Sequence, residues 1–121
     1  MSEKRILIVD DDKSINAVFK TILEEHGYTV NTASSGQEAL SLADSSFDLV
    51  ILDIKLPDIM GDQLAKMMKE RRMADNIVLM TGYPELEDCI DTLGVGIQEI
   101  LLKPISPDEI LRVAREALSK I

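Results

Sequence analysis

The sequence predicts an α/β protein of one domain, a (βα)₅ arrangement with a doubly wound, five-stranded parallel sheet. Two observations carry this prediction. Short apolar runs bounded by turn residues recur along the 121-residue chain, and the segments between them place apolar residues at the three- and four-residue spacing of helices. Strict alternation of this kind is typical of a parallel sheet with helices on both faces. A chain of this length suits a single domain.

Five segments are predicted to form strands. The segment at residues 28–33 alternates apolar and polar residues, and we expect it to be less buried than the others. The other four are mostly continuous apolar runs, which are typical of strands buried on both faces of a parallel sheet. These runs lie at residues 6–9, 49–52, 77–80 and 97–102.

Capping signals mark where two of the helices begin. Ser35 and Ser106 each stand three residues before a glutamate, Glu38 and Glu109, which is the spacing of a capping box. Pro107 also suits the first position of the last helix. The other three helices are predicted from the periodicity of apolar residues, over residues 15–23, 63–71 and 85–93.

Composition and charge exclude several classes of protein. The net charge of −9 argues against unaided binding to nucleic acid, whose phosphates would be repelled. No apolar run approaches the roughly 20 residues that a membrane span requires, and the N-terminus lacks the pattern of a signal peptide. The single cysteine, Cys89, excludes an internal disulfide and indicates the reducing cytoplasm.

Polar residues follow the apolar runs at four of the five predicted strand ends. Asp10 and Asp11 follow the first strand, Asp53 the third, Thr81 the fourth and Lys103 the fifth. Binding groups in open α/β sheets collect at the carboxyl ends of the strands. Each residue taken singly is as easily a turn, a cap or a surface charge. Their joint placement predicts one functional site.

The chemistry of this predicted site suits phosphoryl transfer with a divalent cation. Clustered carboxylates require a counter-charge, and Mg²⁺ is typically held by one or two carboxylates while it binds a substrate phosphate. Lys103 brings a point charge that matches a phosphoryl oxygen, and Thr81 brings a hydroxyl donor. A carboxylate in such a pocket can also be the nucleophile and form an aspartyl phosphate.

These motifs give the chain its resemblance to a known family. The acidic pair in "LIVDDD", Asp53 in "LVILDIKLPDIMG", and the stretches "VLMTGY" and "ILLKP" occur in the order and spacing of a response regulator receiver domain. The chain resembles such receivers, including those of chemotaxis, over essentially its whole length. The resemblance implies a flavodoxin-like fold with strand order 2-1-3-4-5, and one receiver domain over residues 1–121.

The resemblance also implies roles for the residues of the site. It implies that Asp53 accepts a phosphoryl group from a sensor histidine kinase or a histidine phosphotransfer protein. Thr81 and Lys103 are expected to bind phosphoryl oxygens once Asp53 is modified, and the Lys103–Pro104 peptide bond is expected to be cis.

A magnesium site is implied in the same way. Asp10, Asp11 and Asp53 are expected to hold Mg²⁺ together with the backbone carbonyl of Lys55. Asp12 falls outside the resemblance, and its position just before the first helix predicts an N-cap.

The resemblance implies signalling through proteins. Phosphorylation is expected to change the face formed by helix 4, strand 5 and helix 5, and to act on a downstream partner or a C-terminal output domain. The chain is either a stand-alone receiver or a receiver from a longer protein, and a monomer or a phosphorylation-dependent dimer. We expect no nucleic-acid or membrane binding by this domain alone, and no enzymatic activity beyond its own phosphorylation and dephosphorylation.

Two alternatives remain open at this point. Ile100 stands where the family usually has Tyr or Phe, so the chain could be a degenerate receiver that acts as a phosphorylation-independent interaction module. A haloacid-dehalogenase-type phosphohydrolase also uses a nucleophilic aspartate, but it requires a second acid two residues later, where this chain has Lys55.

Overall fold

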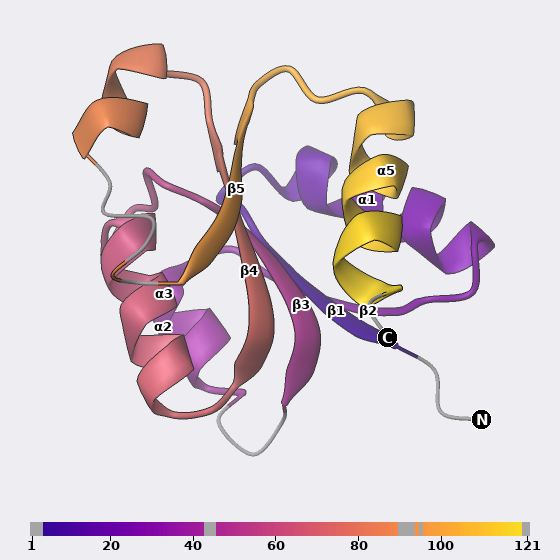
Figure 1. The fold of residues 1–121 in the computed structure, drawn as a ribbon, viewed down its shortest axis with the longest axis horizontal. Helices are drawn as coiled ribbons and strands as arrows, with labels where there is room; N and C mark the ends of the chain where they lie inside the picture. Colours follow the sequence, from indigo (N-terminus) through magenta and orange to yellow (C-terminus); the bar gives the residue numbers. More distant parts are fainter. Residues whose placement is uncertain (1–3, 43–45, 90–93, 95, 120–121) are drawn as a thin grey trace.

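The computed structural model shows the predicted parallel sheet, with strands in the order β2-β1-β3-β4-β5 (Figure 1). It describes residues 4–42, 46–89, 94 and 96–119. All four neighbouring pairs of strands are parallel. The strands are β1 (Arg5–Val9), β2 (Thr29–Ala33), β3 (Phe47–Asp53), β4 (Ala74–Thr81) and β5 (Ile97–Leu102).

Helices cover both faces of the sheet, as the alternation predicted. Figure 1 shows α1 and α5 on one side of the sheet and α2 and α3 on the other. The predicted helix at residues 85–93 is described in part, as the 3₁₀ helix η1, and its remainder, residues 90–93, lies outside the described residues. The helices are α1 (Lys13–Glu25), α2 (Gly36–Leu40), α3 (Gly61–Glu70), η1 (Pro84–Cys89) and α5 (Pro107–Leu118).

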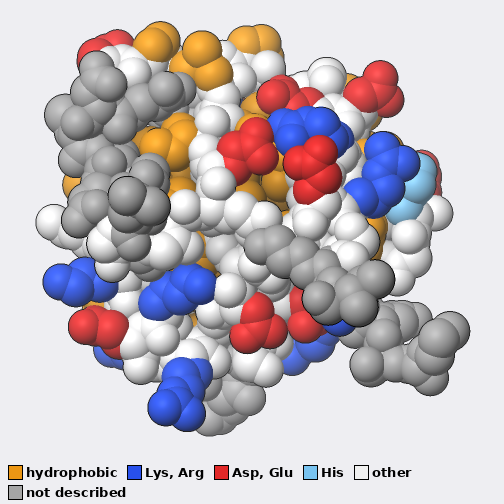
Figure 2. Space-filling model, viewed as in Figure 1, with side chains coloured by type: hydrophobic (Ala, Val, Ile, Leu, Met, Phe, Trp, Pro, Cys, Tyr) orange, Lys and Arg blue, Asp and Glu red, His pale blue; other side chains and the backbone are white. Residues whose placement is uncertain are grey.

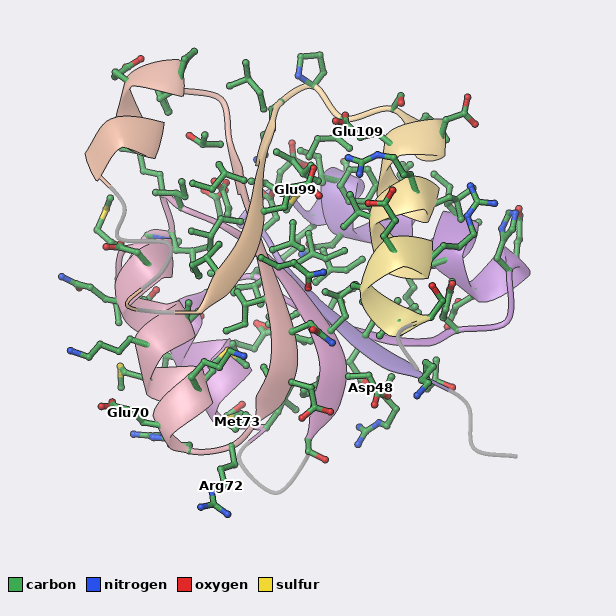
Figure 3. The ribbon with its side chains drawn as sticks, in the orientation of Figure 1. Asp48, Glu70, Arg72, Met73, Glu99 and Glu109 are labelled. Carbon is green, nitrogen blue, oxygen red and sulfur yellow. The ribbon has the colours of Figure 1, made fainter. Side chains whose placement is uncertain are left out.

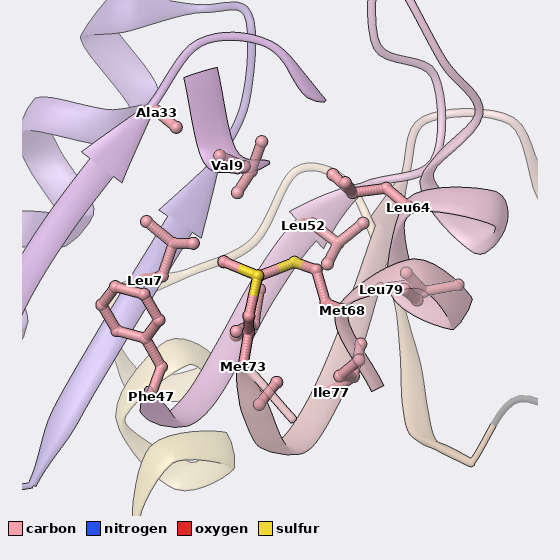
Figure 4. Packing of buried hydrophobic residues seen from close by; sticks show 14 of the residues in the cluster. Leu7, Val9, Ala33, Phe47, Leu52, Leu64, Met68, Met73, Ile77 and Leu79 are labelled. Carbon is pink, nitrogen blue, oxygen red and sulfur yellow. The ribbon is translucent and has the colours of Figure 1, made fainter. Parts of the chain in front are cut away.

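Two apolar layers hold the helices to the sheet. Strand β1 serves both, because Ile6 and Ile8 pack toward α1 and α5 while Leu7 and Val9 belong to the other layer. Figure 4 shows that second layer, with the side chain of Met68 from α3 packed among those of the strands. Successive residues of a strand point to opposite faces, so a continuous apolar run is what two covered faces require.

Strand β5 is a partial exception to the predicted burial. Within it only Ile97 and Leu101 are buried, and Leu102 is 44% exposed. The strand lies at the edge of the sheet, where it has a neighbouring strand on one side only. The apolar run therefore marked the strand correctly, but the predicted burial is incomplete: Ile97 is buried on the α3 side and Leu101 on the α5 side, while the rest of the strand is partly or fully exposed. Strand β2, at the opposite edge, is less buried than β1 or β3, as predicted.

Both predicted capping serines begin their helices. The Oγ atom of Ser35 accepts the Glu38 N–H at 3.0 Å, and that of Ser106 accepts the Glu109 N–H at 3.1 Å. In α2 the glutamate carboxylate reaches back to Ser34 instead of the capping serine itself. Across the described residues, no helix has both the length and the apolar character that a bilayer crossing demands.

Candidate functional site

Three aspartates meet at the carboxyl edge of the sheet. Strands β1 and β3 are paired neighbours, so Asp10, which follows β1, and Asp53, which ends β3, emerge side by side. One carboxylate oxygen from each of Asp10, Asp11 and Asp53 lies within 4.8 Å of the others. Asp10 is fully buried and Asp53 is 7% exposed, whereas Asp11 faces solvent. The structure thus brings together the carboxylates that the sequence predicted would converge.

Lys103 supplies the counter-charge for two of these carboxylates. Its Nζ donates to Asp10 Oδ2 at 2.7 Å and to Asp53 Oδ2 at 2.9 Å. The lysine reaches them because β5 ends beside β4, where the Lys103 N–H donates to the Thr81 carbonyl at 2.7 Å. The Lys103–Pro104 peptide bond that follows is cis, as the resemblance implied.

Burial and hydrogen bonding have opposite effects on the pKa values of Asp10 and Lys103. Burial raises the pKa of Asp10, and the hydrogen bonds from Lys103 and from the Asp12 N–H offset this only in part. Burial alone would lower the pKa of Lys103, but its hydrogen bonds to Asp10 and Asp53 outweigh burial and raise it. The ammonium is therefore firmly charged at neutral pH, which makes it a fixed positive centre between two acids.

Thr81 lies close by but is engaged elsewhere. It ends β4 and is fully buried. Its Oγ1 accepts the N–H of Tyr83 at 2.9 Å and lies 3.4 Å from the carbonyl oxygen of the same residue. The hydroxyl is thus held in a local turn, one residue beyond Met80, which pairs with Asp53.

An open pocket gives access to the group. Its lining includes Asp11, Asp53 and Lys103 from the site, together with Lys55 and Tyr83 from the surrounding loops. Lys55 Nζ lies 4.8 Å from the centroid of the Tyr83 ring, an arrangement that favours a cation–π contact. The backbone N–H of Lys55 donates to Asp53 Oδ1 at 3.2 Å, so this loop touches the carboxylate directly.

The third aspartate of the triplet has a different task. Asp12 Oδ1 accepts the N–H groups of Ser14 at 2.9 Å and Ile15 at 3.3 Å, which makes it the N-cap of α1 as predicted. Its own N–H donates to Asp10 Oδ1 at 2.9 Å. The cap therefore also fixes the orientation of the buried carboxylate beside it.

Asn16 is a supporting residue that the sequence analysis missed. Its side chain is buried in α1, and its Nδ2 donates to the backbone carbonyls of Asp10 at 2.8 Å and Ala33 at 3.2 Å. These bonds tie the end of β1 to the end of β2. The signal in the sequence was a polar residue on the inner, apolar face of the first helix.

Ile100 packs in the described structure as an ordinary apolar residue. It is partly buried in β5 and contacts the apolar layer on the α3 side of the sheet. Next to it, Glu99 extends toward α5 (Figure 3), where Arg112 binds it at 2.8 Å and also binds Glu116 at 2.9 Å. Over this part of the surface, acidic and basic side chains lie side by side (Figure 2).

Comparison with known proteins decides the family. Residues 6–115 match the family model of the response regulator receiver domain. The chain belongs to this family. It is a receiver domain of response regulators, and the acidic cluster of Asp10, Asp11 and Asp53 fits the phosphorylation site of such domains.

Related proteins extend the likeness over nearly the whole chain. The response regulator SaeR of Staphylococcus epidermidis is 34% identical over 116 residues, which cover 96% of this chain and 51% of SaeR. SaeR of Staphylococcus aureus is 33% identical over the same length. The chain therefore spans about half the length of the curated relatives it matches.

Solved receiver structures share the fold closely. A CheY-like receiver domain protein from Methanospirillum hungatei is 38% identical, with a TM-score of 0.88, over 98% of this chain and 95% of the other. The response regulator TrrA of Thermotoga maritima, solved in complex with Mg²⁺-BeF, is 35% identical with a TM-score of 0.82, over 95% of this chain and 99% of the other. These likenesses do not favour the phosphohydrolase or the degenerate receiver.

Proposed function

We propose that Asp53 is the residue that becomes phosphorylated, and that its donor is a phosphohistidine on a sensor histidine kinase or a histidine phosphotransfer protein. The observation that carries this proposal is the position of Asp53 between Lys103 and the open pocket. Its Oδ2 accepts a hydrogen bond from Lys103 at 2.9 Å, and it lines the pocket through which a donor would approach. Asp10 shares the lysine but is fully buried, and Asp11 lines the pocket but is exposed.

The proposed transfer is a displacement at phosphorus. An oxygen of the Asp53 carboxylate forms the new P–O bond while the P–N bond to the donor imidazole breaks. The imidazole keeps the electron pair of the broken bond and takes up a proton. Positioning and charge stabilisation carry most of the catalysis in reactions of this class.

We assign Lys103 and Thr81 to the oxygens of the transferred group. The Lys103 ammonium already lies within hydrogen-bond distance of Asp53, so a phosphoryl oxygen added there comes within its reach. Thr81 is on the neighbouring strand, and its hydroxyl must exchange the bond that it donates to the Tyr83 carbonyl for one donated to the phosphoryl group. That exchange is the first movement that we expect phosphorylation to cause.

Asp10, Asp11, Asp53 and the backbone carbonyl of Lys55 are the groups that we expect to hold Mg²⁺. The close approach of three carboxylates supports this, because Mg²⁺ prefers hard oxygen ligands of this kind. The complex of the related TrrA with Mg²⁺-BeF gives further support. When bound, Mg²⁺ neutralises the negative charge that gathers on the oxygens of the transferred group.

The readout is proposed to lie on the face formed by the helix predicted at residues 85–93, β5 and α5. Leu102 is exposed on β5, and Arg112 joins α5 to β5 through Glu99. A change at Thr81 reaches this face through β5, since Thr81 pairs with Leu102 across the sheet. Phosphorylation would there alter contacts with a protein partner, with an attached output domain or with a second receiver.

The domain, the compartment and the catalytic role that we assign to the chain rest on the same proposal. We assign residues 1–121 to one receiver domain that acts in the cytoplasm through other proteins, without binding nucleic acid or membrane itself. Its only catalytic role in this proposal is to assist its own phosphorylation and dephosphorylation.

The test is a phosphorylation assay followed by intact mass spectrometry. Incubation with acetyl phosphate or phosphoramidate and Mg²⁺ should add the mass of one phosphoryl group to the wild-type protein. The Asp53→Ala variant should take up none, nor should the wild type in excess chelator. Asp12→Ala is the matched control, because it removes a neighbouring aspartate that caps a helix, and it should be phosphorylated. A wild-type protein that takes no phosphoryl group from either donor would contradict the proposal.

A further inference from the structure

The chain between β3 and α3 forms a closed loop, residues 55–60, which we call the β3–α3 loop. Its neck is shut by two contacts: the Gly61 N–H donates to the Ile54 carbonyl, and Lys55 pairs with Met60 in an isolated antiparallel bridge. Near its tip lies Asp58. The loop matters because it carries Lys55, whose N–H contacts Asp53.

Asp58 joins the tip of this loop to the start of α2. Its Oδ1 accepts the N–H of Gly36 at 2.9 Å, and its Oδ2 accepts the N–H of Gln37 at 2.8 Å. The first N–H groups of a helix have no partner within the helix, and they favour a negative charge. The two hydrogen bonds, from Gly36 and then Gln37, lower the pKa of Asp58, so the carboxylate is charged at neutral pH.

A steric contact fixes the same point of the loop. A Cβ atom on Gly36 would clash with Cγ2 of Ile59 and would lie 3.3 Å from Asp58 Oδ1. Ile59 is partly buried against the apolar layer on this side of the sheet. The absence of a side chain at position 36 therefore lets the loop close on α2. Two adjacent loop residues, one polar and one apolar, dock on one glycine.

We propose that Asp58 is a positioning residue for the phosphorylation site, because it docks the β3–α3 loop on α2 and thereby fixes the backbone of Lys55 beside Asp53. The inference rests on the proposed function, in which the Lys55 carbonyl is a ligand of Mg²⁺. With the neck closed and the tip anchored, the loop is held at both ends. A ligand that is already fixed in place costs less ordering when the cation binds.

Removal of the anchor should release the loop without touching a proposed ligand. In Asp58→Ala we expect Mg²⁺ to bind about tenfold more weakly, the scale seen when groups that orient metal ligands are removed. The amides of Gly36, Gln37 and Lys55 should exchange with solvent faster. Asp58→Asn keeps one acceptor oxygen but loses the charge. Its Mg²⁺ affinity and its amide exchange rates should lie between those of the wild type and of Asp58→Ala. Gly36→Ala should resemble Asp58→Ala, because its methyl group displaces Ile59.

Ser35→Ala is the matched control. It removes the hydrogen bond from the Glu38 N–H at the same end of α2, but it leaves the loop contacts in place. Its Mg²⁺ affinity and its exchange rate at Lys55 should equal those of the wild type. Mg²⁺ affinity is measured by calorimetry on the unphosphorylated full chain, and amide exchange by NMR in magnesium-free buffer.

Two results would overturn the inference. One is an Asp58→Ala protein with wild-type Mg²⁺ affinity and wild-type exchange at Lys55. The other is a Ser35→Ala protein that weakens Mg²⁺ binding as much as Asp58→Ala does, since the effect would then come from α2 in general. If wild-type protein bound no Mg²⁺, the proposed function would fail, and the exchange rates in magnesium-free buffer would still decide the role of Asp58.

Discussion

Three consecutive aspartates show how far neighbouring residues of one type can differ. Asp10 is buried and bonded to Lys103, Asp11 is exposed at the mouth of the pocket, and Asp12 caps α1. The end of a strand turns into the start of a helix within these three positions, so each carboxylate points into a different environment. Substitutions within the triplet should therefore separate stability from function.

The Asp12→Ala variant should lose about 1 kcal/mol of unfolding free energy, the typical cost of an N-cap, and should still be phosphorylated. Asp11→Ala removes an exposed carboxylate, so its stability without Mg²⁺ should change little, yet Mg²⁺-dependent phosphorylation should disappear. Urea denaturation and the intact-mass assay measure the two effects. An Asp12→Ala protein that folds normally but takes no phosphoryl group would mean that the triplet has been assigned in the wrong order.

At this scale the sequence predicted which residues meet but not how they are bonded. The ends of parallel strands share one edge, so the meeting of Asp10, Asp53 and Lys103 could be anticipated. That both acids share the Lys103 ammonium could not be anticipated, because it depends on how far the side chains reach between strands that are distant in the chain. The Asp58 contact was missed for the same reason: nothing near Asp58 in the sequence indicates that its carboxylate accepts N–H groups at the start of α2.

At the scale of elements, the junction of β3 and α3 depends on a close approach of two backbone segments. A Cβ atom on Gly61 would overlap the Asp53 carbonyl oxygen and would lie 2.7 Å from the Cα of Ile54. Both obstacles are backbone atoms, which cannot rotate away. Because residue 61 has no side chain, α3 can begin this close to the end of β3.

Gly61→Ala should destabilise the protein by about 2–3 kcal/mol, in the upper range for overpacking. Gly82→Ala is the matched control, because a Cβ atom there meets nothing within 4 Å; it should change stability by less than about 1 kcal/mol. Denaturant unfolding of the two variants gives the comparison. Equal stabilities would show that the β3–α3 junction tolerates a methyl group.

Element predictions succeeded where one local signal dominated. Ser106 and Pro107 marked the start of α5 because capping requires only neighbouring residues. The partial exposure of β5 was not foreseen, since an apolar run has the same composition in the centre of a sheet and at its edge. The position of a strand within the sheet depends on the crossovers, which local sequence does not encode.

For the whole molecule, the balance of charge links stability to Mg²⁺. The chain carries a net charge of −9, and three of its acids converge on a site where Lys103 pairs with two of them. A cation that binds the folded state alone stabilises it by mass action. Mg²⁺ binding at this site should therefore raise the free energy of unfolding, in addition to its proposed part in signalling.

Mg²⁺ at 100 times its dissociation constant should raise the unfolding free energy by about 2.7 kcal/mol. Excess chelator should reverse the gain, and Asp11→Ala should show little of it. Urea unfolding with and without Mg²⁺ at constant ionic strength measures the effect, and NaCl controls for general screening. An equal gain in Asp11→Ala would place the cation elsewhere on the protein.

The two hydrogen bonds from Lys103 to Asp10 and Asp53 join residues that are 93 and 50 positions apart in the chain. The acceptor therefore does not exist in any short stretch of the protein, and a growing chain that still lacks its last strand has the acids without their counter-ion. Under the proposed function, we expect Asp53 to be phosphorylated only in molecules whose last strand has joined the sheet. A kinase would then transfer its phosphoryl group to fully folded receivers and not to incomplete chains.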